Sequence, residues 1–350
     1  VRLLRTGLSD GLQAVELDSG AFRAIVLPGR GMGVWKGYCG EDEVGWQSPV
    51  SGPVHPKYVP ISEPSGLGWL SGFDELLVRC GLESNGAPQF DPAGKLEYPL
   101  HGRIANLPAQ RVELAIDGES GELRLTGEVD ESRFHFQKLR LRSTLSMRPG
   151  QRGFDVEDTI TNIGGARAEA QMLYHINFGA PVCLPGSKLL LAIDEMSPRD
   201  ATATARLEQW DTFADEEVNS AEQVYFCKLL ANSEGWNTAM VRNAHQTKGV
   251  SVSFDTATLP YFSVWKNTPM RADGYCVGLE PATNFPNTRG HEAGQGRVVS
   301  LDAGESVSLK LCVEYHATAE QVAEAAQQVA QLQAAQQPTI HSHPKSGWCL

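Results

Sequence analysis

The sequence lacks the motifs of several common enzyme classes. It has no CxxC cysteine pair at zinc-binding spacing, no phosphate-cradling glycine loop and no serine or cysteine nucleophile motif. These absences argue against a zinc ribbon, a P-loop nucleotide site and a nucleophile-based hydrolase. No apolar run approaches the roughly 18 residues that a membrane helix needs. We therefore expect no membrane association.

Basic residues are also scarce. The chain of 350 residues has 30 Lys and Arg against 42 Asp and Glu, a net charge of -12. Nucleic-acid-binding proteins usually carry a basic face, so we expect no nucleic-acid partner. The 7 cysteines are an odd number and most lie in apolar runs, which favours free thiols in a reducing compartment. Since no hydrophobic leader follows the N-terminal arginines, we expect a cytoplasmic protein.

What the chain does contain is a succession of short β-rich segments. They alternate with turn signals such as Asp117-Gly118 and Asn162-Ile163-Gly164-Gly165, a pattern typical of an all-β sandwich or barrel. No linker divides the chain, so we predict one β-sandwich domain over residues 1–316. The expected strands include residues 22–27, 111–116, 139–145, 154–160, 250–254, 261–265 and 307–313.

One helix is predicted after the β domain, within a C-terminal unit of residues 317–350. Thr318 and Gln321 form a capping box, an apolar stripe at three-four spacing follows, and Pro338 ends the segment. The stripe can lie on the sandwich or form a dimer seam, so a monomer and a homodimer both remain open. Residues 341–350 are expected to be a flexible tail, in which His341 and His343 have no functional role.

The segment from Trp46 to Gly86 is rich in Pro, Gly and Ser and is predicted to be irregular. A loop of this length in a compact domain is usually functional. We therefore expect it to form a wall of the substrate pocket.

Three separate segments supply candidate acid and base groups. His101 stands where a loop enters a strand, His175 lies in a strand whose alternation also places Asn177 on its face, and Glu280 closes an apolar strand. Two imidazoles and a partly desolvated carboxylate can exchange protons near neutral pH. The alternatives are solvent-facing histidines and a structural ion pair of Glu280 with Arg289 or Arg297. Trp265 and Lys266 add an aromatic ring and a donor suited to a sugar.

These segments together resemble the aldose 1-epimerase (galactose mutarotase-like) superfamily, and in particular a bacterial branch of it. The similarity covers roughly residues 10–316. It rests on residues 27–32, 80–82, 100–103, 174–179, 265–266 and 279–284, in this order along the chain.

The resemblance implies a galactose mutarotase-like β-supersandwich, here with a short C-terminal helix, and a sugar cleft across its concave sheet. It implies Glu280 as the base that takes the proton of the anomeric hydroxyl, His175 as the acid that protonates the ring oxygen, and His101 as an orienting histidine. The substrate contacts that it implies by position are Arg79, Trp265, Lys266, Asn284 and Arg30.

The function predicted from the sequence is therefore an isomerase that interconverts the anomers of a free sugar or related hemiacetal. Ring opening needs one basic and one acidic group beside the substrate, and it needs no cofactor or metal. Three alternatives stay open: another reaction on the same scaffold, such as proton abstraction from a keto-sugar or elimination; carbohydrate binding without catalysis; and a metal site of His and Glu residues like that of cupin barrels.

Overall fold

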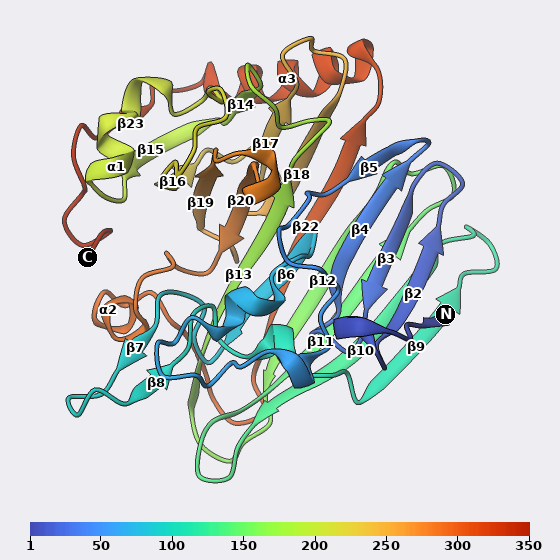
Figure 1. The fold of residues 1–350 in the computed structure, drawn as a ribbon, viewed down its shortest axis with the longest axis vertical. Coiled ribbons are helices and arrows are strands. Elements are labelled where there is room, and N and C mark those ends of the chain that lie inside the picture. The colour runs from blue at the N-terminus through green and yellow to red at the C-terminus, as the bar shows by residue number, and fades with distance from the viewer.

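Two large sheets, packed face to face, form most of the molecule (Figure 1). The computed structural model describes all residues, 1–350. The larger sheet has 13 strands and the smaller has 8, and a separate two-stranded ribbon consists of β7 (Gln89–Phe90) and β8 (Leu96–Tyr98). Because strands far outnumber helices and form two layered sheets, the predicted all-β sandwich is confirmed.

The larger sheet carries the elements that matter for the site. Its strand order is β1 (Arg2–Leu3), β2 (Gln13–Asp18), β3 (Arg23–Leu27), β4 (Gly33–Cys39), β6 (Leu77–Leu82), β13 (Ala168–Phe178), β20 (Cys276–Ala282), β19 (Tyr261–Asn267), β16 (Gln223–Leu229), β15 (Ile193–Pro198) and β23 (Thr339–Ile340). Two short strands pair at its side: β5 (Asp42–Val44) with β4, and β21 (Val299–Leu301) with β13.

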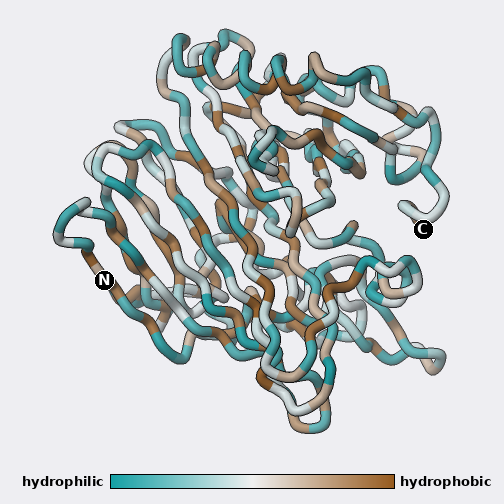
Figure 2. Tube along the Cα trace, turned by 180° about the vertical axis from the view of Figure 1, so that it is seen from behind, coloured by the Kyte–Doolittle hydropathy of each residue, from teal (hydrophilic) through white to brown (hydrophobic).

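The smaller sheet is a second layer of antiparallel strands. Its order is β14 (Lys188–Leu190), β17 (Trp236–Arg242), β18 (Gly249–Asp255), β22 (Ser306–His316), β12 (Gly153–Asn162), β11 (Lys138–Met147), β10 (Leu123–Ser132) and β9 (Arg111–Ile116). Its central strands β11 and β12 alternate buried and accessible residues. Figure 2 shows the hydropathy along the chain, with hydrophobic and hydrophilic segments interleaved through the strands. Alternation of this kind gives one face to the core and the other to water.

Two separate apolar clusters lie on opposite faces of the larger sheet. The main core, of 53 buried residues, fills the space between the two sheets. A smaller cluster covers the other face and includes Trp46, Trp69 and Phe73 from the segment 46–86. Within β13, Tyr174 and Ile176 belong to the main core and Leu173 to the smaller cluster. The alternation read from the sequence thus places the two faces of β13 correctly.

The three α-helices are α1 (Ala201–Ala205), α2 (Arg289–Gly294) and α3 (Ala319–Gln333). In α3 the side chain of Thr318 caps the first turn, and Val322, Ala325 and Val329 pack on Ala192 and Met240 of the sandwich. The predicted C-terminal helix therefore lies on the β domain. None of the helices has the length and apolar character that a membrane crossing requires.

The last residues differ from the expected flexible tail. β23 pairs in parallel with β15, His341 contacts Glu195 at 2.7 Å, and Trp348 is only 6% exposed. The Trp348 ring lies 4.8 Å from that of Phe285. The polar composition of the segment suggested disorder. Instead, the segment adds a strand to the free edge of β15 and buries Trp348 beside Phe285. The segment 46–86 is also less irregular than expected, because β6 lies within it.

Candidate active site

The three predicted acid–base residues lie in one cavity of about 350 Å³. His175 comes from the centre of β13, Glu280 from the neighbouring strand β20, and His101 from the turn after β8. The Nε2 atom of His175 is 3.2 Å from Oε1 of Glu280, and the two imidazole rings are 5.5 Å apart. Both His175 and Glu280 are almost fully buried. Three side chains far apart in sequence thus face one ligand-sized hollow.

Aromatic side chains form much of the cavity wall. Trp69 and Phe73 come from the segment 46–86, which therefore does line the cavity, and Trp265 comes from β19. The ring of Trp69 lies 4.6 Å from that of His101, and Phe73 and Trp265 lie 4.9 and 5.2 Å from His175. These rings offer flat apolar surfaces and shield the acid–base pair from water.

Hydrogen bonds fix the orientation of His175. The amide nitrogen of Asn177 donates to the carbonyl of Glu75 at 3.0 Å, which directs its Oδ1 atom at Nδ1 of His175, 2.7 Å away. Because that oxygen can only accept, Nδ1 carries a hydrogen. The other ring nitrogen, Nε2, is then the one that faces Glu280.

His101 is held in a similar way. Its backbone has a positive φ of 56°, a conformation that is costly for a residue other than glycine. Its Nδ1 atom donates to the carbonyl of Asn85 at 2.9 Å, which leaves Nε2 as an acceptor in the neutral ring. His101 can therefore accept a hydrogen bond from a substrate hydroxyl.

Burial disfavours the charged form of all three groups. Desolvation raises the pKa of Glu280 well above its ordinary value, and the nearby charge of Glu222 raises it further. Desolvation lowers the pKa of His175 well below its ordinary value, with a contribution from His101, and burial also lowers the pKa of His101. Each shift disfavours the charged form. These shifts favour a single proton shared between Glu280 and His175.

Two buried polar atoms of the cavity have no hydrogen-bond partner. They are Nε1 of Trp69 and Oε1 of Glu280, whose contact with His175 is close but lacks hydrogen-bond geometry. Buried polar atoms are nearly always satisfied in folded proteins, so an unpaired donor and an unpaired acceptor in one cavity point to a polar ligand.

The comparisons with known proteins agree with this picture. A family model described as a domain of unknown function, DUF4432, matches residues 9–315. A crystal structure from Klebsiella pneumoniae, provisionally named an aldose 1-epimerase, is 32% identical, with a TM-score of 0.94 over 99% of this chain and 90% of that chain. The chain belongs to the galactose mutarotase-like superfamily. A search of curated proteins finds no match.

More distant structures share the fold of this mutarotase-like protein. A galactose mutarotase-like protein from Clostridium acetobutylicum is 15% identical, with a TM-score of 0.60 over 89% of this chain and 97% of that chain. A galactose 1-epimerase from Lactobacillus acidophilus is 11% identical, with a TM-score of 0.58 over 90% and 97%. At these identities the likeness concerns the fold alone.

Two of the arginines expected to contact substrate lie elsewhere in this mutarotase-like fold. Arg79 is 1% exposed and forms an ion pair with Asp158, while its β6 neighbours Val78 and Cys80 face the cavity side. Alternation along the strand therefore directs Arg79 into the main core. Arg30 is buried in an ion pair with Glu75. The expectation that these two arginines bind substrate is wrong in this geometry.

Lys266 and Asn284 also lie outside the cavity. Lys266 follows Trp265 on β19 and so points to the opposite face, where its ammonium donates to the carbonyls of Gln209 and Thr212, both at 2.8 Å. Asn284 exchanges two 2.9 Å hydrogen bonds with the side chain of Asn85. It therefore supports Asn85, the residue that holds His101, and does not reach the cavity itself.

The sequence did not point to the polar pair beside the cavity. Arg199, after β15, and Glu222, before β16, both line it and are 2.9 Å apart. Glu222 also accepts a 2.7 Å hydrogen bond from Nε1 of Trp265. Single charged residues at strand ends are common, so nothing in the sequence distinguished these two. Single apolar residues are equally common, so the sequence did not mark the rest of the apolar lining either. It comprises Leu67, Leu70, Ala87, Leu100, Val224 and Pro286.

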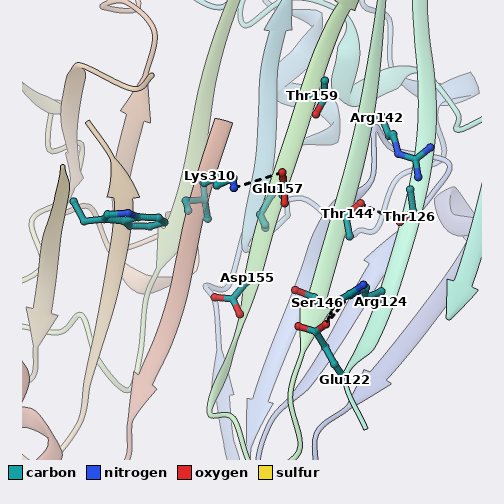
Figure 3. Close-up of a pocket in the computed structure, with 13 residues that line it drawn as sticks. Glu122, Arg124, Thr126, Arg142, Thr144, Ser146, Asp155, Glu157, Thr159 and Lys310 are labelled. Carbon is teal, nitrogen blue, oxygen red and sulfur yellow. Dashed lines mark hydrogen bonds and ion pairs between the residues drawn. The ribbon is translucent and has the colours of Figure 1, made fainter. Parts of the chain in front are cut away.

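A larger hollow lies on the outer face of the smaller sheet (Figure 3). Its volume is about 620 Å³, but its charged residues are all in ion pairs, as Lys310 is with Glu157 at 3.7 Å. Its floor includes the hydroxyl pair Thr126 and Thr144, 3.0 Å apart. It contains no histidine and no buried titratable group, so it lacks the means for acid–base chemistry. The chain also has no cluster of three or more His, Cys, Asp or Glu that could hold a metal.

Proposed function

We propose that this protein is an aldose 1-epimerase-like isomerase that interconverts the anomers of a free sugar or a related hemiacetal. The observation that carries the proposal is the close approach of His175 and Glu280, 3.2 Å apart and buried in one cavity. The superfamily and the similarity to the Klebsiella pneumoniae protein support it.

The reaction needs two proton transfers. In the reactive form the proton that the pair shares lies on Nε2 of His175, so that His175 is an imidazolium and Glu280 a carboxylate. The carboxylate of Glu280 takes the proton of the anomeric hydroxyl, and the Nε2–H of His175 gives its proton to the ring oxygen. The bond between the anomeric carbon and the ring oxygen breaks, and a carbonyl forms at the anomeric carbon. After rotation of the aldehyde, the hydroxyl made from the ring oxygen attacks either face and both protons return. Atoms and charge balance without a cofactor.

The rest of the cavity has positioning roles in this proposal. Nε2 of His101 accepts from a sugar hydroxyl, since its Nδ1 is committed to Asn85. The unpaired Nε1 of Trp69 donates to a substrate oxygen, and Trp265 packs against a C–H face of the sugar. A volume of about 350 Å³ suits a monosaccharide. We propose a small-molecule carbohydrate as the ligand, with no cofactor and no metal.

The test is anomeric exchange measured by NMR or polarimetry across a panel of aldoses and sugar acids. Glu280→Gln and His175→Asn should each lower kcat by about 10²–10⁴-fold, the range supplied by a positioned acid or base. Sugar affinity should be nearly unchanged in Glu280→Gln, because the amide has the same shape as the carboxyl group. Glu157→Gln, on the outer face of the smaller sheet, is the matched control and should keep full activity.

Two results would redirect the assignment. Sugar binding by the wild type without any acceleration of exchange would leave carbohydrate binding as the function. Turnover of keto-sugars or oxidised glycosides, with free aldoses unaffected, would leave proton abstraction or elimination on the same scaffold.

A further inference from the structure

β9 is an unprotected strand at the edge of the smaller sheet. It pairs only with β10, at the outer side of the molecule in Figure 1, and all six of its residues are exposed. Val112, Leu114 and Ile116 are 41, 54 and 66% exposed. Natural sheets usually blunt such edges with Pro, Lys or a bulge, because a free edge invites pairing with another strand. Residues 111–116 contain no Pro or Lys and pair with β10 without a register shift; their two charged side chains, Arg111 and Glu113, form an ion pair with each other on the face opposite the apolar row.

The free edge presents the main-chain groups of the apolar residues. Asp117 donates its N–H to the carbonyl of Glu122, the residue opposite it. Hydrogen-bonded pairs alternate along an antiparallel ladder, so Arg111, Glu113 and Ala115 also direct their main-chain groups at β10. The N–H and C=O groups of the three alternate residues, 112, 114 and 116, therefore point away from the sheet. The same three residues therefore carry the unpaired main-chain groups of the free edge and the exposed apolar side chains.

We propose that β9 pairs antiparallel with β9 of a second copy of this chain, with Leu114 opposite Leu114 on the two-fold axis. This register places Val112 opposite Ile116 of the second copy, so the apolar row is continuous across the junction. On the other face it places Arg111 opposite Asp117 of the second copy, an attractive pair that occurs twice. Six main-chain hydrogen bonds close, and the two smaller sheets become one.

Neighbouring registers are less favourable. A shift that puts Glu113 on the axis brings two carboxylates face to face and sets Gln110 opposite Ile116. A shift in the other direction puts Ala115 on the axis and opposes Glu113 to Asp117. Like charges directly opposite each other destabilise a strand pair. Charge complementarity thus selects the register with Leu114 on the axis.

The side chains that gain most from pairing face inward. Leu114 is opposite Leu125 of β10, which is 1% exposed in the main core. The apolar row of β9 is therefore an uncovered continuation of the core face of the sheet. In the dimer the apolar row of each copy packs against that of the other. Each Å² of apolar surface removed from water in this way stabilises the dimer by about 25 cal/mol. Two short strands bury a modest area, so the expected dimer is concentration-dependent.

Cysteine cross-linking tests the register directly. In a hydrogen-bonded antiparallel pair the Cα atoms are about 5.5 Å apart, within the range of a disulfide. Leu114→Cys should therefore give a covalent dimer under mild oxidation, beyond any seen for the wild type with its seven cysteines. Glu113→Cys is the matched control and should not, because Glu113 faces Ala115 of the second copy. Cross-linking of the control alone would overturn the register.

Sedimentation tests the dimer itself. At about 100 µM, where an affinity of micromolar order gives mainly dimer, the wild type should sediment at twice 38.0 kDa. Leu114→Lys should sediment as a monomer with unchanged circular dichroism. Val218→Lys, at a position 70% exposed and remote from β9 in sequence, should remain dimeric. A wild type that is monomeric at this concentration, or a Leu114→Lys variant that stays dimeric, would overturn the proposal. Neither result bears on the isomerase activity, since β9 does not line the cavity.

Discussion

At the scale of single residues, the character of the site comes from what surrounds two histidines and a glutamate. An imidazole in water titrates near neutral pH and a carboxyl well below it, so free groups of these types would differ in charge at pH 7. Inside the cavity, burial moves the pKa of Glu280 up and that of His175 down. The two groups therefore compete for one proton, and their titration belongs to the pair.

We predict a plateau of activity around neutral pH. In the proposed mechanism Glu280 and His175 together hold one exchangeable proton. Because the pKa of His175 is lowered, the second proton binds only at acidic pH; because the pKa of Glu280 is raised, the last proton is retained to higher pH than in a free carboxyl. Measured kcat/KM should therefore fall at acidic pH, where His175 binds a second proton, and at alkaline pH, where Glu280 loses the last one.

A variant separates the two limbs. The charge of Glu222 contributes to the raised pKa of Glu280. Glu222→Gln should therefore move the alkaline limb to lower pH and leave the acid limb in place. An activity that rises steadily across the whole range, with or without Glu222, would contradict the proposed pair.

At the scale of elements, the alternation of two strands brings the acid and the base together. β13 and β20 are neighbours, with Ile176 opposite Leu279 and Asn177 opposite Gly278. Gly278 lies on the same face as Glu280, two residues away. A Cβ atom at Gly278 would be 2.7 Å from Oε1 of Glu280 and 3.0 Å from Cε1 of His175. Only a glycine leaves room for the pair here.

Gly278→Ala is therefore expected to damage catalysis more than folding. The added methyl group must displace Glu280 or His175, and a displacement of about 1 Å can cost on the order of 10²-fold in rate. We expect kcat to fall by that order while the far-ultraviolet circular dichroism stays unchanged. Gly165→Ala, with no atom within 4 Å of the added Cβ, is the control. Full activity in Gly278→Ala would mean that the spacing of the pair does not matter.

The same alternation explains which parts of the site could be predicted from the sequence. The period of two placed His175 and Asn177 on one face of β13 and its apolar residues on the other. Applied to Val78, Arg79 and Cys80, it would have turned Arg79 away from the cavity; that arginine was instead assigned by its position in a motif. Lys266 was misplaced in the same way, beside Trp265.

Other features depend on contacts that a linear pattern does not record. Arg199 and Glu222 meet only because β15 and β16 are adjacent in the sheet. The docking of the C-terminal segment depends on a free edge of β15 and on a hollow beside Phe285. Both arise from tertiary packing, which overrides local composition.

At the scale of the whole molecule, the C-terminal segment braces one side of the cavity. The carbonyl of Trp348 accepts a 2.7 Å hydrogen bond from Asn287, next to Pro286 of the cavity wall. The backbone N–H of Lys345 donates a 2.8 Å hydrogen bond to the hydroxyl of Ser197, two residues before Arg199. The segment thus links two stretches of wall that are far apart in the sequence. The acid–base pair itself has no contact with it.

Trp348→Ala should therefore separate binding from chemistry. Loss of a buried tryptophan costs about 3–5 kcal/mol in a core, and we expect a fall of about 2–3 kcal/mol in the free energy of unfolding at this peripheral site. The loosened wall should raise KM several-fold, while kcat stays close to that of the wild type because β13 and β20 are untouched. Leu350→Ala, in the same segment but 73% exposed, is the matched control and should change neither quantity. Denaturant unfolding and NMR exchange kinetics on both variants measure this. A fall in kcat with KM unchanged would show that the segment acts on the acid–base pair and not on the wall.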